Sequence, residues 1–414
     1  MNEPIARTRR AGVAVSLLTG GSDKPYAFGL ATSLISQGAT IDLIGSSQID
    51  CPEFHTNPNL TLFLLRGSLR RDVAFIDKAF RISSYYARLV AYSAFARPRL
   101  FHILWNNRFE FFDRTVLMGF YRALGKKVVL TAHNVNARRR DSNDSTLNRF
   151  TLRIQYRLAN HIFVHTEQMR RELIEEFGVP EKRITTVPFG INNAVPNTRL
   201  TGAEAKQRLG IRETDKAMLF FGRIKPYKGI EYLIDAFRLL LRTRQDYRLI
   251  IAGRADTGDS YWKSLLNDVR DYTQRGSAII IPEFIPDHET EVYFKAADVL
   301  VLPYRRIYQS GVLFLGFSFG LPALVADVGS LRDEIVEGQN GFVFKPEDPV
   351  ALADAIERYF ASDLYADLDR RRNDIKSHAN QRHSWEGVAQ TTMNVYAKLL
   401  GVSLRRDLRN SESA

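Results

Sequence analysis

The chain has 414 residues, of which 45% are hydrophobic and 25% are charged. This composition excludes a disordered chain, and the length predicts two domains of roughly 150 to 200 residues each. The single cysteine, Cys51, excludes an intrachain disulfide and a Cys-rich metal cluster, and it fits a reducing cytoplasm.

Short apolar runs alternate with segments of helical length in the first half, as is typical of βαβ units in a parallel sheet. The basic N-terminus leads into an apolar run at 11–18 that faintly resembles a signal peptide. Because this run is short and lacks an A-x-A-like site, a first strand is predicted instead. Strands are predicted at 13–18, 40–44, 60–65, 100–104, 127–131 and 161–165, and helices at 25–37, 73–95 and 147–158.

A turn-rich, polar segment at 189–205 precedes a second series of the same kind, and it predicts a domain boundary near residue 195. The fold class is therefore α/β, with two doubly wound Rossmann-like domains and a ligand cleft at the carboxyl ends of both sheets. The predicted domains are 1–195 and 196–380, followed by a C-terminal helix and a frayed tail in 381–414. Strands of the second series are predicted at 217–221, 248–252, 277–281, 299–303, 322–326 and 341–344.

An apolar stretch has no charged side chain between Arg306 and Asp327. A transmembrane helix is excluded because polar residues and glycines interrupt the run, and Pro322 ends any helix near Gly320. The stretch is predicted to form a buried helix from Val312, followed by a buried strand.

Positive charge is concentrated in the first half of the chain. Residues 1–200 contain 28 Lys/Arg and 16 Asp/Glu, a net charge of +12, whereas residues 201–414 contain 30 of each, a net charge of 0. The first half is therefore expected to meet nucleic acid, a membrane surface or a phosphorylated substrate. Nucleic acid is disfavoured because no reader motif accompanies the charge.

The strongest local signal is LFFGRIKPYKGIEYLIDAF at 219–237. Gly222 allows a turn after a strand, and Arg223 and Lys228 flank a loop before an amphipathic helix. Two cations beside a helix N-terminus suit a diphosphate whose charge grows as a bond to it breaks. The alternative is that both are solvated loop charges. Dinucleotide, P-loop and metal-binding motifs are absent, so no metal site is predicted.

Several motifs, in this order, resemble the GT-B retaining glycosyltransferases of family 4. They are GGSDKPYAFGL (20–30), VVLTAHN (128–134), ITTVPFGIN (184–192), FFGRIKPYKGIEYLIDAF (220–237), AADVLVLPY (296–304) and GLPALVADVGSLRDEIVEGQNGFVF (320–344). The resemblance implies a nucleotide-sugar donor held mainly by the second domain and an acceptor held by the first. It also implies retention of the anomeric configuration without a protein nucleophile, metal or cofactor.

The resemblance implies a role for each matching residue. Arg223 and Lys228 grip the donor diphosphate, and His133 contacts the transferred sugar or stabilises developing charge. Judged from its position alone, a histidine at the end of a buried strand is equally a core residue. Backbone N–H groups at the predicted helix start also face a phosphate. The predicted donor contacts are Gly20, Gly21, Gly222, Gln309, Ser310, Gly311 and Val312.

The chain departs from the family pattern at two positions. The family places two glutamates eight positions apart, one for sugar hydroxyls and one for the ribose, and those positions hold Ile307 and Leu315 here. The donor base and sugar therefore stay open, and neutral groups such as Gln309 are candidates to read hydroxyls. Two alternatives remain: a catalytically degenerate GT-B protein that binds a nucleotide or a partner, and a sugar-nucleotide epimerase.

Residues 70–99 interleave basic and aromatic side chains. On a helix they form either a surface for an anionic membrane leaflet, with Arg81 and Arg88 in it, or a solvated helix with its aromatic residues in the core. Arg138 and Arg139 lie after His133 in either an acceptor-phosphate dock or a mobile loop. We expect a cytoplasmic, peripherally membrane-bound enzyme that glycosylates a lipid-linked or polysaccharide precursor of the bacterial envelope or exopolysaccharide.

Overall fold

The computed structural model describes residues 12–20, 23–67, 75–193, 195–256 and 258–403. The chain divides into two compact units, and the main segment of the second begins at Pro188, whereas the sequence suggests a boundary near 195. No helix within these ranges is both long and apolar enough to cross a membrane. The first unit comprises Met1–Val135, Ser145–Val187 and Trp385–Ala414, and the second comprises Asn136–Asp144 and Pro188–Ser384.

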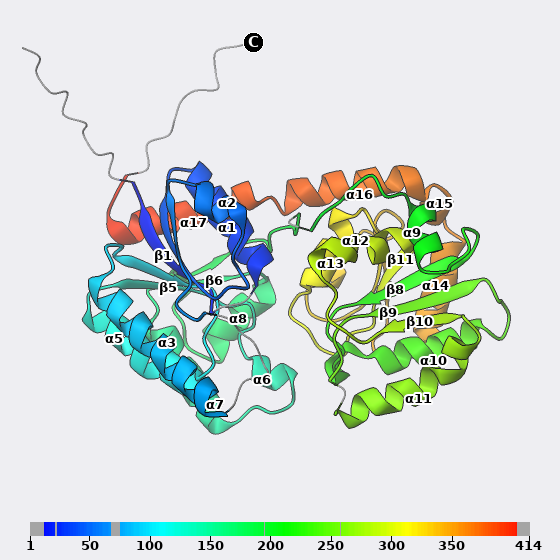
Figure 1. Ribbon diagram of the computed structural model, residues 1–414, viewed down its shortest axis with the longest axis horizontal. Coiled ribbons are helices and arrows are strands. Elements are labelled where there is room, and N and C mark those ends of the chain that lie inside the picture. The colour runs from blue at the N-terminus through cyan, green and yellow to red at the C-terminus, as the bar shows by residue number, and fades with distance from the viewer. Residues whose placement is uncertain (1–11, 21–22, 68–74, 194, 257, 404–414) are drawn as a thin grey trace, which may run out of the picture. The chain divides into compact units, whose positions relative to one another are not determined.

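The first unit contains a seven-stranded parallel sheet in the order β3-β2-β1-β4-β5-β6-β7 (Figure 1). The six predicted strands are confirmed to within two residues at each end, and β7 is an additional strand. Its sequence, Ile-Thr-Thr, is too short to give a recognisable apolar run. The strands are β1 (Ala14–Leu18), β2 (Thr40–Ile44), β3 (Leu60–Phe63), β4 (Leu100–Ile103), β5 (Lys127–Thr131), β6 (His161–Val164) and β7 (Ile184–Thr186).

Helices flank this sheet, including the C-terminal α17, which packs on α1. The Trp385 ring lies 5.0 Å from the Tyr26 ring and directly over Gly29, where a Cβ atom would lie 2.1 Å from the indole. The helices are α1 (Lys24–Ser36), α2 (Pro52–Thr56), α3 (Phe75–Phe95), α4 (Glu110–Phe112), α5 (Met118–Ala123), α7 (Thr146–Leu158), α8 (Glu167–Glu175) and α17 (Trp385–Leu400), with short turns η1 (Asp113–Leu117) and η2 (Glu181–Arg183).

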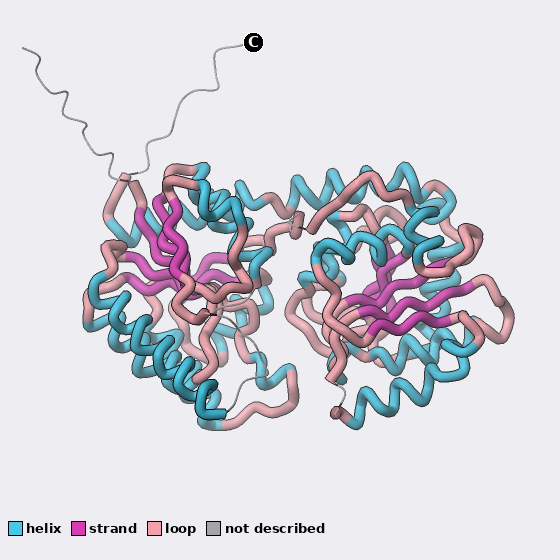
Figure 2. The backbone as a smooth tube through the Cα atoms, in the orientation of Figure 1, coloured by secondary structure: helices cyan, strands magenta, loops and turns pink. Residues whose placement is uncertain are grey.

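The second unit contains a six-stranded parallel sheet in the order β10-β9-β8-β11-β12-β13, and helices line its faces (Figure 2). Its strands are β8 (Lys216–Phe221), β9 (Tyr247–Ala252), β10 (Ala278–Ile281), β11 (Val299–Leu302), β12 (Ala323–Ala326) and β13 (Gly341–Phe344). Its helices are α6 (Ala137–Arg140), α9 (Gly202–Arg208), α10 (Ile230–Leu240), α11 (Ser260–Gln274), α12 (Asp287–Ala296), α13 (Gly311–Ser318), α14 (Pro349–Phe360), α15 (Asp363–Ala366) and α16 (Leu368–Arg382), with η3 (Pro226–Lys228) and η4 (Arg332–Glu334).

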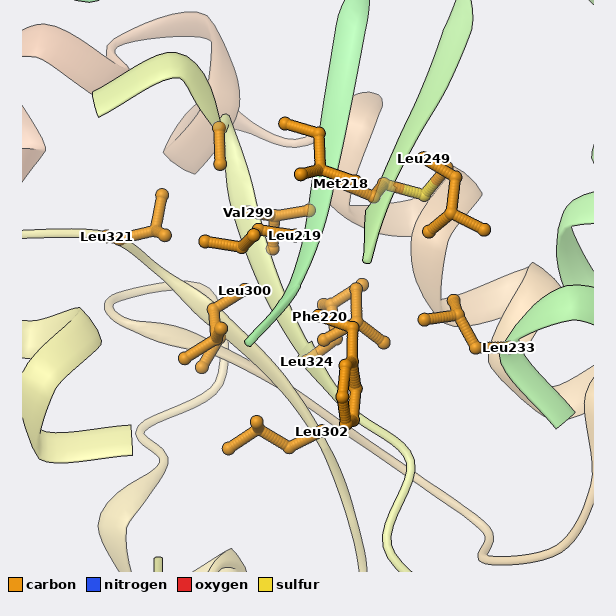
Figure 3. Close-up of a cluster of buried hydrophobic side chains, with 14 of the residues drawn as sticks. Met218, Leu219, Phe220, Leu233, Leu249, Val299, Leu300, Leu302, Leu321 and Leu324 are labelled. Carbon is orange, nitrogen blue, oxygen red and sulfur yellow. The ribbon is translucent and has the colours of Figure 1, made fainter. Parts of the chain in front are cut away.

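The core of the second unit lies around its central strands. Side chains of β8, β9 and β11 meet those of α10 and β12 in one apolar cluster, which includes Phe220, Leu233 and Leu300 (Figure 3). Every residue of β11 and β12 is buried, as expected for parallel strands covered on both faces. The apolar stretch before Asp327 is confirmed as a buried helix, α13, followed by a buried strand, β12.

In both sheets the order in which successive strands are added reverses beside the first strand. In the first unit the order runs outward on either side of the β1–β4 pair, and in the second on either side of the β8–β11 pair. Ligands of doubly wound sheets bind beyond the carboxyl ends of the strands at such a switch point. The loops after β1 and β4 and those after β8 and β11 therefore lie at these switch points.

Candidate functional site

Glycines bring the backbone after β8 into close contact with its neighbours. Gly222 follows β8 with a φ of 109°, and a Cβ atom on Gly253 would lie 2.1 Å from the Gly222 carbonyl oxygen. Gly229 follows η3 with a φ of 63°, and a Cβ atom there would lie 2.1 Å from the Pro303 carbonyl oxygen. Only glycine combines this conformation with this approach. The loop is thereby held against the end of β11.

Lys228 is held by this loop in the interior of the second unit. Its side chain is buried, and its Nζ atom lies 3.8 Å from the centroid of the Tyr304 ring. Burial, assisted by the charge of Arg140, lowers the pKa of Lys228 to about 7. Within the described ranges Lys228 has no carboxylate partner. The interpretation as a solvated loop charge is therefore wrong for Lys228.

Tyr304 connects Lys228 to the start of α13. The Tyr304 hydroxyl lies 3.2 Å from the Ser310 hydroxyl, and Ser310 is the N-cap residue of the helix. Its side chain makes no capping hydrogen bond to the first turn, which begins at Gly311, one residue before the predicted start. A Cβ atom on Gly222 would lie 3.3 Å from Val312. The structure thus brings together four predicted donor contacts, Gly222, Ser310, Gly311 and Val312.

Two arginines interact electrostatically with Tyr227. Arg223 is exposed directly after Gly222 and, among the described residues, has no carboxylate partner. Arg140 on α6 was not singled out from the sequence, yet its guanidinium lies 4.5 Å from the Tyr227 ring centroid. Its predicted neighbours Arg138 and Arg139 are both exposed on α6. Only tertiary packing distinguishes the third arginine of the Arg-Arg-Arg run from the first two.

The positions of the missing glutamates are occupied by packed apolar side chains. Leu315 is buried in the core of the second unit, and Ile307 packs against that core. Gln309, the predicted neutral substitute, is half-buried between Tyr308 and Ser310. The loop after β11 therefore carries hydroxyl and amide groups but no carboxylate.

His133 is buried in the first unit beyond the carboxyl end of β5. Its ring stacks on Trp105, with centroids 4.0 Å apart and planes 7° apart, and it forms a T-shaped pair with Tyr26, with centroids 4.6 Å apart. Burial, followed by the neighbouring His165, holds the pKa of His133 well below its ordinary range. His133 is therefore a neutral imidazole at physiological pH.

Gly20 joins the same part of the first unit. It has a φ of 62°, and a Cβ atom there would lie 2.7 Å from the Asn106 carbonyl oxygen. The loop after β1 thus packs on the loop after β4, which also carries Trp105. Gly21, also predicted to lie near the diphosphate, is outside the described residues.

His165 is a neighbour of His133 that the sequence did not single out. Its Nε2 atom lies 3.2 Å from His133 Nδ1, and its Nδ1 atom lies 3.2 Å from the Val187 carbonyl oxygen. The feature that could have identified His165 is its position at the carboxyl end of β6, which lies beside β5 in the sheet. Strand order, which sequence leaves open, decides whether these two ends meet.

The predicted membrane helix, α3, is divided between core and surface. Tyr85 is buried, Tyr86 donates a hydrogen bond to Asp113, and Tyr92 donates one to Asp42. The core alternative is confirmed for Tyr85, whereas Tyr86 and Tyr92 are half-buried. Exposed aromatic and basic side chains on α3, on the α4 region and on α7 form what we term the α3–α7 surface: Phe80, Arg81, Arg88, Phe109, Phe111, Arg149 and Phe150, with Arg81 only half-exposed.

In the ranges that the structure describes, no group of three or more His, Cys, Asp or Glu side chains is arranged to hold a metal ion. The predicted site residues instead form two groups. One lies in the first unit around His133, and the other lies in the second unit around Lys228.

Two family models match nearly the whole chain. The model described as Glycosyltransferase Family 4 matches residues 7–195, and the model described as Glycosyl transferases group 1 matches residues 202–382.

Curated proteins with similar sequences are also glycosyltransferases. An uncharacterized glycosyltransferase of Methanocaldococcus jannaschii is 28% identical over 236 residues, which cover 56% of this chain and 58% of that protein. A D-inositol 3-phosphate glycosyltransferase of Acidothermus cellulolyticus is 28% identical over 247 residues, which cover 58% of this chain and 54% of that protein. The match thus spans little more than half the length of these relatives.

Solved structures share the fold. Sucrose-phosphate synthase from Thermosynechococcus elongatus matches with a TM-score of 0.74 at 18% identity, over 94% of this chain and 100% of that one. HepE of Anabaena in complex with UDP and glucose matches with a TM-score of 0.70 at 16% identity, again over 94% and 100%. With its two parallel sheets of seven and six strands, the chain has the GT-B fold and belongs to the group 1, family 4 type of glycosyltransferases.

Proposed function

We propose that the chain is a retaining glycosyltransferase that moves a sugar from a nucleotide-diphosphate sugar to an acceptor. The observation that carries this proposal is the buried Lys228 ammonium group, which has no carboxylate partner in the described part of the chain. Burying an unpaired cation costs several kcal/mol. An anionic ligand at this point offsets that cost, and a diphosphate also suits Arg223 and the first turn of α13.

The proposed reaction needs little from the protein beyond positioning and charge. The bond between the anomeric carbon and the diphosphate oxygen breaks, and the acceptor hydroxyl forms the new bond on the same face of the sugar. The acceptor proton passes to the departing diphosphate oxygen, so no protein base is required. Lys228 and Arg223 stabilise the charge that grows on this leaving group. The proposed reaction uses no metal ion.

A UDP-sugar is the first donor to test, because HepE of Anabaena, which has the same fold, has been solved with UDP and glucose. We propose a lipid-linked or polysaccharide-precursor acceptor of the bacterial envelope or exopolysaccharide, held by the first unit. The excess of positive charge in residues 1–200 and the α3–α7 surface support an anionic membrane as the meeting place. The exposed Arg138 and Arg139 suit an acceptor phosphate. The protein would then work at the cytoplasmic face of the membrane.

The donor assignment is tested with UDP-, GDP- and ADP-sugars in the absence of acceptor and metal. We expect one donor to raise the melting temperature and to be slowly hydrolysed, with released nucleotide as the readout. Because a charged hydrogen bond contributes about 1.5 to 3 kcal/mol, Lys228→Ala or Arg223→Ala is expected to weaken donor binding by about tenfold to a hundredfold.

Lys225→Ala is the matched control in the same loop. The Lys225 ammonium group already lies 3.8 Å from Asp259 and 4.0 Å from Asp256, so it has less need of a ligand anion. Normal donor turnover in Arg223→Ala or Lys228→Ala would refute the diphosphate assignment.

A second candidate is a degenerate GT-B protein that binds a nucleotide or a partner without transferring sugar. The apolar packing of Ile307 and Leu315, where the family pattern has carboxylates, favours it. The buried charge of Lys228 is costly, and its retention together with Arg223 argues against decay of the site. Failure of every nucleotide sugar to bind would favour this candidate. Conversion of a donor without acceptor into an isomeric nucleotide sugar would instead indicate an epimerase.

A further inference from the structure

The structure assigns a positioning role to His165: it fixes the tautomer of His133 so that His133 presents an unprotonated Nε2 atom. We infer that His133 therefore accepts a hydrogen bond from a neutral donor, such as a sugar hydroxyl, and does not bind a phosphate oxygen. That this hydrogen-bond donor belongs to the substrate rests on the proposed function. The tautomer itself does not depend on it.

The assignment follows from a chain of three groups in the first unit. The Val187 carbonyl oxygen can only accept, so His165 Nδ1, at 3.2 Å, must carry a proton and donate to it. In a neutral His165 the Nε2 atom then has only a lone pair. Because His133 Nδ1 lies 3.2 Å from that atom, His133 must donate from Nδ1. Its own Nε2 atom is left as an acceptor.

A charged His165 would reverse the second hydrogen bond, but the surroundings disfavour it. His133 and His165 are both buried, with 6% and 8% of their surfaces exposed. The rings of Tyr26 and Trp105 cover the pair, with Tyr26 5.8 Å from His165 and Trp105 stacked on His133. Burial in such an environment penalises an imidazolium and favours the neutral ring. The Val187 carbonyl oxygen then sets the direction of both hydrogen bonds.

The orientation of the His133 ring is fixed as well as its tautomer. Trp105 stacks on one face, Tyr26 packs against the ring in a T-shaped pair, and His165 holds Nδ1. An acceptor fixed in this way can distinguish a hydroxyl from an anionic oxygen, because the lone pair repels the latter. The His133 contact in the first unit therefore differs in chemistry from the diphosphate contact in the second unit, where Lys228 and Arg223 supply positive charge.

The tautomers are measured by nitrogen NMR of the full chain labelled with ¹⁵N in its eight histidines, because a ring nitrogen that carries a proton is distinguished from one that has a lone pair. We expect protonated Nδ1 atoms in both His133 and His165 without any ligand. In His165→Leu, which removes the acceptor, the His133 proton is expected to move to Nε2. In His165→Gln, whose amide oxygen can still accept, it is expected to stay on Nδ1.

His161→Leu is the matched control. This histidine begins β6, the strand that ends just before His165, and bonds Thr185 at 2.8 Å, so its loss should leave the His133 tautomer unchanged. A proton on His133 Nε2 in the wild type, or one that remains on Nδ1 in a folded His165→Leu, would overturn the assignment. If His165→Leu does not fold, the wild-type spectrum still decides.

Binding measurements test the hydroxyl contact of His133 separately from the proposed UDP-sugar donor. Calorimetry with UDP-glucose and with UDP compares a ligand that has sugar hydroxyls with one that has none. We expect His165→Leu to weaken UDP-glucose by about threefold to tenfold and UDP hardly at all, the range for one hydrogen bond. Equal losses for both ligands would overturn the hydroxyl contact. If the wild type binds neither ligand, the UDP-sugar assignment fails while the tautomer result stands.

Discussion

At the scale of single residues, Lys228 makes donor binding sensitive to pH. Its pKa in the free protein is about 7, lowered from 10.5 mainly by burial, and a bound diphosphate favours the charged form. A nucleotide-diphosphate sugar does not titrate near neutral pH, so the lysine sets the profile. We expect the Kd for UDP-glucose to be constant below about pH 7 and to rise by up to about tenfold per pH unit above it.

Calorimetric titrations between about pH 6 and 9 check this profile, with Lys228→Met expected to bind weakly and without the slope. Lys225→Met should keep the slope, and a flat wild-type profile would contradict the proposal.

The same pKa shift of Lys228 affects folding stability with a defined sign. The unfolded chain holds the Lys228 proton more tightly, so this group's contribution makes the apoprotein more stable as pH rises from about 7 towards about 10.5.

Some residues of the candidate site could be predicted from the sequence, and others could not. Lys228 and Ser310 could be predicted from local patterns, because Lys228 is one of two cations that flank a loop before a helix and Ser310 stands at the start of a predicted helix. Arg140 and His165 could not, because their importance comes from neighbours that are far away in the sequence. Burial was equally hidden, since it makes Lys228 an internal cation while Arg223, five positions earlier, stays exposed.

At the scale of elements, apolar runs located every strand except β7. Parallel strands between two layers of helices are buried on both faces, so they are visible as continuous apolar segments. Helix α3 was harder, because spacing alone could not say which aromatic side chains enter the core. Tyr85 does so, and the half-buried Tyr92 bonds both Ser16 and Asp42, whereas Phe80 stays exposed.

The α3–α7 surface leads to a prediction about membranes. Arg81 and Arg88 lie two helical turns apart on α3, on which Phe80 is also exposed. A basic residue near anionic lipid contributes about 1 kcal/mol, so Arg81→Gln combined with Arg88→Gln should weaken vesicle binding by about 2 kcal/mol. Cosedimentation with phosphatidylserine vesicles measures this, while transfer to a soluble acceptor should be unaffected.

The matched control for this double variant is Arg270→Gln combined with Arg275→Gln. Those arginines are exposed at the end of α11 in the second unit, so the total charge changes equally. If both double variants lose vesicle binding to the same extent, net charge and not the α3–α7 surface is responsible. Unchanged binding in the Arg81 and Arg88 variant would remove these residues from the membrane surface.

At the scale of the whole molecule, the first unit is assembled from three separate segments of the chain. The C-terminal segment supplies α17, whose Tyr396 hydroxyl lies 2.5 Å from His102 Nδ1 in the core of the first unit. The second unit is nearly continuous and receives only Asn136–Asp144 from elsewhere. The two units therefore depend on different parts of the sequence for stability, which calorimetry can separate.

Trp385→Ala tests this division. The indole fills the space over Gly29 and contacts Tyr26, and loss of a packed tryptophan costs about 3 kcal/mol at the lower end of its range. We expect it to lower the unfolding transition of the first unit. A donor at 100 times its Kd stabilises the unit that binds it by about 2.7 kcal/mol and should raise the other transition. A single transition that both changes shift together would show that the units unfold as one.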